Sequence, residues 1–319
     1  MRGDAPVTSI CAEARRFGIA VPAEPAHVRH RMATHTVVPA MEPRPFVTSD
    51  IDVFGLTHQG RVRKTNADHF LVGTFHRQLR VRYSSIGDDL GPSETESRGL
   101  IALVADGVGN LGKAAEGSAK ALATVAQHLL HASEICSTMA MSQEEFAIDQ
   151  LKQSFAAAHK VLRDEAEESG TAASATTLTL YAAFWPRAFV VHVGDSRIYR
   201  LRGKEFRRLT TDQTVAQMMV EAGAMTPEVA ERSRLKHVLW SAVGSSEAVP
   251  EVVVTDCDLR DRTLVCSDGL TKHVSDDEIR AHLERDVAAK ETCQALVDLA
   301  LERGGSDNVT VVIGGVRKL

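Results

Sequence analysis

Aspartates stand at the ends of the apolar runs in this chain, and most of them have glycine as a neighbour. Asp106 directly follows the run Leu100–Ala105, and Asp268 comes just after Leu264–Cys266. The same placement recurs after residues 190–193, before residues 308–313 and at the start of residues 67–75, with Asp195, Asp307 and Asp68. Short apolar runs bounded by turn residues are typical of buried strands. The aspartates at their ends are therefore predicted to be partly buried.

Strands that share a sheet bring their ends together, so these aspartates are expected to converge. Like charges in a low-dielectric site repel one another unless cations neutralise them. Ligands that are all oxygen select hard ions such as Mg²⁺, Mn²⁺ or Ca²⁺ over Zn²⁺ or Cu²⁺. A single aspartate of this kind is usually a turn or capping residue, but the five together favour a site for divalent cations.

The chain divides into an N-terminal tail and one globular domain. Residues 1–46 contain six prolines and no sustained hydrophobic period, so an irregular or disordered tail is predicted. Residues 47–319 carry the strand and helix patterns of the domain. These patterns occur in blocks and do not alternate strictly. That grouping favours an α+β layered fold over a doubly wound parallel sheet.

Hydrophobic periodicity predicts the individual elements. Apolar residues at helical spacing from Ala115 to Leu129 and from Ile148 to Leu162 predict two amphipathic helices, whose apolar faces we interpret as core. Helices are also expected near 214–222, 275–283 and 291–302, with Ser275 and Glu278 as a capping box. Strands are predicted over 52–57, 67–75, 100–105, 176–184, 188–193, 198–201, 251–255, 263–266 and 308–313.

The composition argues against several classes of protein. The net charge of -5 argues against a dedicated nucleic-acid binder, which would usually be basic. The 5 cysteines are scattered without a C-x-x-C spacing, which speaks against a disulfide framework or a zinc site. No run of about 18 apolar residues is present, so no membrane span is expected. A cytoplasmic location is expected by elimination.

Short motifs, taken in order, resemble a known family. They are Arg63–Asp68, Asp106–Gly109, Ala175–Thr177, Gly194–Arg197, Leu209–Asp212, Ser267–Gly269 and Ser306–Asn308. No single motif is specific, but the ordered set is similar to the metal-dependent protein serine/threonine phosphatases (type 2C, or PPM) in their bacterial form. The resemblance implies a four-layer α-β-β-α sandwich with two central antiparallel sheets.

The same resemblance implies roles for named residues. Asp106 would bridge two Mn²⁺ or Mg²⁺ ions, and the carbonyl of Gly107 would bind one of them. Asp268 and Asp307 would complete the shell of one ion, and Asp68 would hold metal-bound water. Asp195 matches a ligand of a weaker third ion. Arg63 matches the arginine that clamps the substrate phosphate, a task that suits a planar guanidinium with parallel donors.

The implied reaction is hydrolysis of phosphoserine and phosphothreonine in proteins by a metal-activated water. Phosphorylated proteins would be the substrates of a monomeric enzyme, and a serine/threonine kinase would be its natural opponent. No nucleic acid or membrane is expected as a partner. Residues 213–243 match the mobile flap of bacterial members, which would govern substrate access.

Two alternatives stay open on the sequence alone. Ala67 stands where the family usually has glutamate, so a non-catalytic relative that binds phosphoproteins is one alternative. A metal-dependent hydrolase of another class, such as a nuclease, is the other. Retention of all the metal-binding aspartates argues against the first alternative, and the lack of a basic excess argues against the second.

Overall fold

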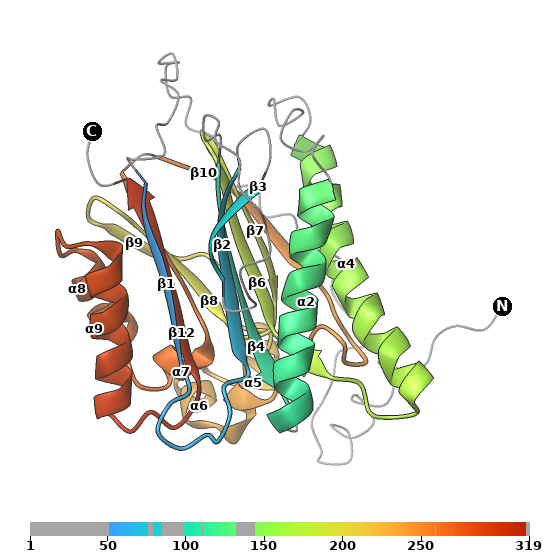
Figure 1. Cartoon of the computed structure of the whole chain (residues 1–319). Helices are drawn as coiled ribbons and strands as arrows, with labels where there is room; N and C mark the ends of the chain where they lie inside the picture. The colour runs from blue at the N-terminus through green and yellow to red at the C-terminus, as the bar shows by residue number, and fades with distance from the viewer. Residues whose placement is uncertain are drawn as a thin grey trace.

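The computed structural model describes residues 51–75, 79–84, 99–109, 111–131, 144–258 and 260–316. The expected tail, residues 1–46, lies outside the described residues. The described residues form two sheets with helices on their outer sides (Figure 1).

One sheet is built from strands distant in sequence. Its order is β1 (Ile51–His58), β12 (Val309–Val316), β11 (Asp261–Cys266), β8 (Arg197–Arg202) and β9 (Glu205–Arg208), and all neighbours are antiparallel. Successive side chains of β11 point to opposite faces of this sheet, and both faces are buried. Leu264 and Cys266 pack into an outer cluster with helices, whereas Val265 between them packs into the cluster between the sheets.

The second sheet carries the other half of the fold. Its order is β10 (Glu251–Asp256), β7 (Arg187–Val193), β6 (Leu178–Phe184), β4 (Gly99–Val108), β2 (Asp68–Phe75) and β3 (Leu79–Ser84). The short β5 (Ala175–Thr176) pairs with the end of β4. Each of these pairings is antiparallel.

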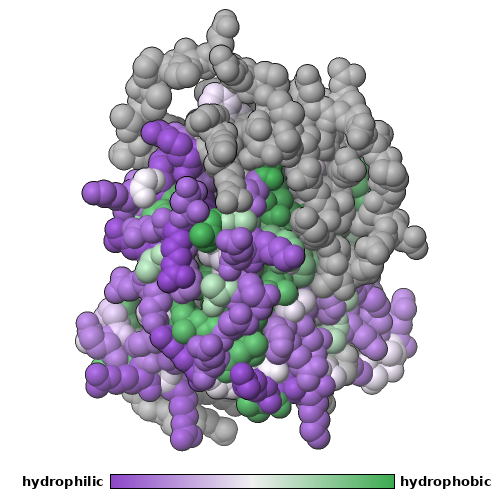
Figure 2. Space-filling view, turned by 60° about the vertical axis from the view of Figure 1, so that its left-hand side comes forward, coloured by the Kyte–Doolittle hydropathy of each residue, from purple (hydrophilic) through white to green (hydrophobic). Residues whose placement is uncertain are grey.

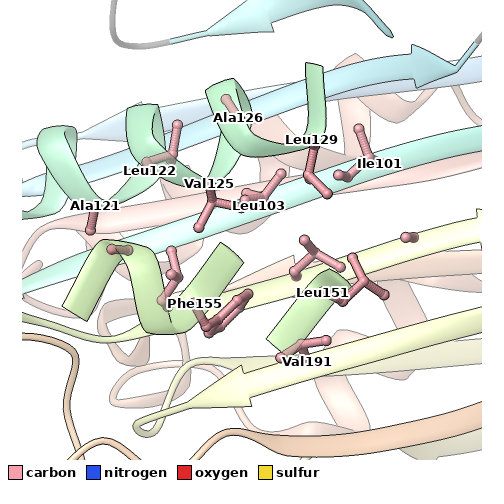
Figure 3. Close-up of a cluster of buried hydrophobic side chains, with 14 of the residues drawn as sticks. Ile101, Leu103, Ala121, Leu122, Val125, Ala126, Leu129, Leu151, Phe155 and Val191 are labelled. Atoms are coloured by element: carbon pink, nitrogen blue, oxygen red, sulfur yellow. The ribbon is translucent and has the colours of Figure 1, made fainter. Parts of the chain in front are cut away.

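Helices cover the outer faces of both sheets. The long pair α2 (Leu111–His131) and α4 (Glu144–Ser169) packs on the second sheet. Leu122 and Val125 of α2 and Leu151 and Phe155 of α4 share one buried cluster with Leu103 of β4 (Figure 3). On the other side, α8 (Asp276–Leu283) and α9 (Ala289–Glu302) cover the first sheet. A central cluster of buried side chains joins the two sheets. The expected four-layer α-β-β-α sandwich is confirmed.

Most predicted elements occur within a few residues of their expected bounds. The capping box of Ser275 and Glu278 is present at the start of α8. Some features differ from expectation. The strands β3 and β9 and the short helices α6 (Pro227–Arg232), α7 (Asp268–Thr271) and η3 (Arg234–His237) are additional to the predicted elements, and the start of the expected loop over 82–99 belongs to β3. The strand β4 also continues past Asp106, where the sequence predicts its end. The ladder continues because Gly107 and Val108 pair with β5.

The predicted flap region is helical and lies at the same end of the molecule as α7 (Figure 1). It contains α5 (Val215–Glu221), α6 (Pro227–Arg232) and the 3₁₀ helix η3 (Arg234–His237). Hydroxyl caps begin all three helices, with Thr214, Thr226 and Ser233 accepting hydrogen bonds from backbone amides. The sequence prediction placed a helix at 214–222, close to the bounds of α5.

Among the described helices, none combines the length and apolarity that crossing a membrane requires. Hydrophilic side chains cover much of the described surface on the face shown in Figure 2, with smaller hydrophobic areas between them.

Candidate metal centre

Two neighbouring strands of the second sheet bring Asp68 and Asp106 side by side. Asp68 begins β2, Asp106 lies inside β4, and the antiparallel register pairs the two residues directly. Side chains in such a pair lie on the same face of the sheet, about 5 Å apart at Cβ, and like charges there are destabilising. The fold therefore holds an unfavourable pair of carboxylates that another group must neutralise.

The backbone at Asp106 is tightly fixed. Its amide donates to Thr177 Oγ1 at 3.1 Å, and its carbonyl accepts from the Thr177 amide at 2.8 Å and from Thr176 Oγ1 at 2.9 Å. The next residue, Gly107, has no room for a side chain, because a Cβ there would lie 2.4 Å from the carbonyl oxygen of Ala114 in α2. Asp106 is thus held on a rigid element, as a functional side chain requires.

Two further aspartates come from the first sheet. Asp268 opens α7 just after β11, and Asp307 lies two residues before the start of β12. Gly269 lets these segments touch, since a Cβ at Gly269 would lie 1.8 Å from the carbonyl oxygen of Asn308. The aspartates were expected to converge at one sheet, but the structure draws Asp68 and Asp106 from one sheet and Asp268 and Asp307 from the other.

Asp195 lies in the turn between β7 and β8, where the chain passes from one sheet to the other. Gly194 supplies the positive φ of 113° that this turn needs. Gln213 holds the turn with two hydrogen bonds. Its side-chain Oε1 accepts from the Gly194 backbone amide at 3.0 Å, and its backbone amide donates to the Gly194 carbonyl at 2.7 Å. Asp195 is buried.

Burial, and then mutual repulsion, raises the pKa values of three of these aspartates. Burial, followed by repulsion from Asp68, Asp268 and Asp195, raises the pKa of Asp106 well above its usual value. Burial also raises the pKa of Asp68 to about 6, although hydrogen bonds from Ser267 and Thr310 oppose the shift. Burial and repulsion from Asp268 raise the pKa of Asp195 in the same way. These carboxylates are held together without enough positive charge.

Arg63 and Lys272 provide the cations that the site does contain. Arg63 makes a two-point contact with Asp307, from Nε to Oδ1 at 2.6 Å and from Nη2 to Oδ2 at 2.8 Å. Lys272 Nζ lies 2.6 Å from Asp268 Oδ2 and 2.7 Å from Asp307 Oδ2. Although burial acts to raise the pKa of Asp307, these two cations keep it below its usual value.

The carboxylates suit divalent cations because they offer oxygen ligands and because some of these oxygens have no hydrogen-bond partner. Two buried carboxylate oxygens, Asp68 Oδ1 and Asp268 Oδ1, have no hydrogen-bond partner. Unpaired acceptors of this kind are costly in a protein interior, and a bound ion is one way to satisfy them. Among the residues that the structure describes, no three acidic, His or Cys side chains already surround one point. A cation that takes Asp268 and Asp307 as ligands must therefore replace their contacts with Lys272 and Arg63.

Supporting residues that sequence reasoning missed complete the site. Asn308 holds the segment 59–65, which carries Arg63. Its Nδ2 donates to the carbonyls of Gln59 at 2.7 Å and Thr65 at 3.0 Å. Ser267 and Thr310 both donate to Asp68 Oδ2, at 2.7 and 2.8 Å. Ser267 and Asn308 lie in two of the recognised motifs, so their neighbourhood was visible in the sequence. Their long-range partners were not.

A family model described as protein phosphatase 2C matches residues 80–299. This chain belongs to the protein phosphatase 2C family. The matched range contains Asp106, Asp195 and Asp268 but neither Arg63 and Asp68 before it nor Asp307 after it. The structure brings Arg63 and Asp307 into direct contact and places Asp68 opposite Asp106.

Two curated relatives are named as protein phosphatases. Serine/threonine protein phosphatase PstP of Mycobacterium tuberculosis is 40% identical over 141 residues, which are 44% of this chain and 27% of PstP. Protein phosphatase PhpP of Streptococcus pneumoniae is 33% identical over 156 residues, which are 49% of this chain and 62% of PhpP. The aligned part of the chain thus spans less than two thirds of the length of these curated relatives.

A solved structure agrees over most of the fold. The catalytic domain of PstP, crystallised in complex with 2 manganese ions, matches with a TM-score of 0.62 and 29% sequence identity. The match covers 84% of this chain and 99% of that domain. The two sheets and their helices are therefore those of a protein phosphatase 2C domain.

Proposed function

We propose that this chain is a metal-dependent protein phosphatase that hydrolyses phosphoserine and phosphothreonine in proteins. The observation that carries the proposal is the group of buried and half-buried aspartates from both sheets, with unpaired carboxylate oxygens and with Arg63 at its exposed edge. Membership of the protein phosphatase 2C family and the manganese complex of PstP support the same reading.

The metal ligands are proposed as Asp106 and the carbonyl of Gly107, with Asp268 and Asp307. Asp68 would act through water, and Asp195 would serve a third ion. Bound Mn²⁺ or Mg²⁺ would supply the Lewis acidity that makes water a nucleophile near neutral pH. Asp106 is suited to the central position because its backbone is held on both sides, by Thr176 and Thr177 and by the tight packing at Gly107.

Arg63 is proposed to bind the substrate phosphate. Its side chain is 43% exposed, and it already holds a carboxylate by two parallel donors. A phosphate group offers the same two-oxygen geometry to a guanidinium. Asn308 fixes the carbonyls on either side of Arg63, at Gln59 and Thr65, and so limits where the guanidinium can reach.

Replacing Arg63 by alanine is expected to raise KM about 10- to 100-fold, with a smaller change in kcat, because phosphate binding begins in the ground state. The neighbouring exposed cation is the control: Lys64→Ala should change KM less than about twofold. Steady-state kinetics on a phosphothreonine peptide give both constants. A fall in kcat with KM unchanged would contradict the phosphate-binding role.

Metal loading is expected to stabilise the fold, because it neutralises the repelling aspartates. At a free Mn²⁺ concentration about 100 times Kd, the gain is about 2.7 kcal/mol, or roughly 5–10 °C in Tm. The gain should shrink below about pH 6, since Asp68 then binds a proton that the metal must displace. Thermal unfolding with Mn²⁺ and with EDTA, at about pH 5 and about pH 7.5, measures both effects. An equal gain at both pH values would contradict proton competition at this site.

The same proposal extends to the substrates, the opposing enzyme, the oligomeric state and the cellular location. Phosphorylated proteins are the proposed substrates, a serine/threonine kinase is the proposed opposing enzyme, and the chain is proposed to act as a monomer in the cytoplasm. Free thiols at Cys257, Cys266 and Cys293 suit a reducing compartment.

The proposed activity is tested by phosphate release from phosphoserine, phosphothreonine and phosphotyrosine peptides, each with Mn²⁺, Mg²⁺ or EDTA. Release from the first two peptides that needs the metal and stops with EDTA is the expected result. A folded protein that binds phosphopeptides without releasing phosphate would instead support a non-catalytic binding module.

A further inference from the structure

Lys272 contacts two of the proposed metal ligands at once. Its ammonium lies between Asp268 and Asp307, at 2.6 and 2.7 Å from one oxygen of each. The Lys272 side chain is 22% exposed, and the two aspartates are 16% and 17% exposed. The ammonium therefore sits where a divalent cation would need the same carboxylate oxygens.

The position of Lys272 is set by the local helix. Asp268 opens α7 and Lys272 caps its C-terminal end, four residues later, with its amide donating to the Asp268 carbonyl at 2.8 Å. Residues four apart on a helical turn lie on the same face, so the ammonium stays within reach of the Asp268 carboxylate. The backbone of α7 thus places the Lys272 side chain beside Asp268.

A purely structural ion pair would be satisfied on both sides. Away from the site, Arg202 and Asp261 make such a pair, in which both oxygens of Asp261 accept from the guanidinium, at 2.6 and 2.7 Å. The pair of Lys272 and Asp268 differs from it, because Asp268 Oδ1 remains buried and without a hydrogen-bond partner. One ammonium with one charge neutralises this group of aspartates only in part.

We propose that Lys272 is a built-in competitor of the divalent cation: its ammonium stabilises Asp268 and Asp307 in the metal-free protein, and metal binding displaces it. The inference rests on the metal role in the proposed function and goes beyond it by assigning a residue that sets metal affinity. If the paired arrangement is populated at about 90–99% without metal, the apparent Kd for metal is about 10- to 100-fold weaker than that of a site without the lysine.

Calorimetric titration with Mn²⁺ tests the proposal without reference to turnover. Lys272→Met should bind Mn²⁺ at least about tenfold more tightly than the wild type, since the competing charge is gone. Lys272→Arg, which keeps the charge, should stay within about threefold of the wild type. Lys236→Met is the matched control, because Lys236 pairs with Glu231 in the flap region, and its Kd should equal that of the wild type. In EDTA, Lys272→Met should also unfold at a lower temperature than the wild type.

Two results separate this inference from the proposed function. Equal or weaker Mn²⁺ binding by a folded Lys272→Met variant overturns the inference alone. Absence of Mn²⁺ binding in both proteins overturns the inference together with the metal site.

A second measurement uses the wild-type protein and does not depend on any variant folding. Labelling with an amine-reactive reagent, read by mass spectrometry, should modify Lys272 slowly in EDTA and at least about threefold faster with Mn²⁺, as the ammonium is released. Labelling of Lys236 should not change. If Lys272 is labelled equally in both conditions, the displacement does not occur and the proposal is wrong.

Discussion

Asp106→Asn is expected to reduce phosphate release at least about 1,000-fold while the protein stays folded, because the proposed bridging ligand loses its charge. The side chain keeps its size, and the backbone bonds of Asp106 to Thr176 and Thr177 do not involve the carboxylate. Activity on a phosphothreonine peptide with saturating Mn²⁺ gives the comparison. Asp149→Asn, an exposed position on α4, is the control and should keep full activity.

The same variant should lose activity but unfold less readily than the wild type when no metal is bound. Burial and repulsion from three aspartates raise the pKa of Asp106, so the ionised group destabilises the metal-free fold. Its removal is expected to raise the free energy of unfolding in EDTA by about 1 kcal/mol or more, the trade-off seen where strained sites serve function. A folded Asp106→Asn variant with wild-type activity would contradict the metal role of Asp106.

Gly269→Ala is expected to destabilise the protein by about 3 kcal/mol, although alanine is the better helix former and Gly269 lies in α7. The cause is the close approach to Asn308, whose carbonyl oxygen would lie 1.8 Å from the new Cβ. Because that oxygen belongs to the backbone, α7 and β12 would have to move apart, and Asp268 and Asp307 would move with them. Weaker Mn²⁺ binding should accompany the loss of stability.

Urea unfolding measures this effect, and Gly203→Ala provides the comparison. Gly203 also has a special conformation, with φ of 58°, but a Cβ there meets nothing within 4 Å. Its replacement should cost about 1 kcal/mol, from backbone conformation alone. If Gly269→Ala were as stable as the wild type, the close packing of α7 against β12 would be wrong.

The aspartates were predictable because strand ends are visible in a single sequence. Apolar runs such as Leu100–Ala105 show period and length, and the carboxylates beside them stand out against that pattern. The sequence did not show that β4 continues through Asp106, because that depends on pairing with β5, which lies far along the chain. For the same reason it did not show that Asp68 faces Asp106 directly.

Lys272 and Asn308 were missed for a different reason. Each looks like an ordinary polar residue until the partner segment is in place: Asp307 lies 35 residues from Lys272, and Gln59 lies 249 residues from Asn308. The four-residue spacing of Asp268 and Lys272 was the one local signal available. Long-range contacts of this kind follow from topology and not from local pattern.

Ala67, where the family usually has glutamate, has a clear place in the structure. Its side chain is buried, its amide donates to Asn308 Oδ1 at 2.8 Å, and its carbonyl accepts from Ser118 Oγ at 2.6 Å. The backbone of Ala67 therefore joins β12, β2 and α2 beside the proposed site. A small side chain is compatible with that role, so this departure leaves the placement of Asp68 intact.

The most direct test of the metal centre is a crystal structure of the Mn²⁺-loaded protein, with the ions located by the anomalous scattering of manganese. We expect at least two ions at the end of the sandwich where the sheets meet, with Asp106 bridging them, Asp268 and Asp307 coordinated, and the Lys272 ammonium moved away from both. Manganese at other positions only, or none in crystals of a folded and Mn²⁺-saturated protein, would contradict the account.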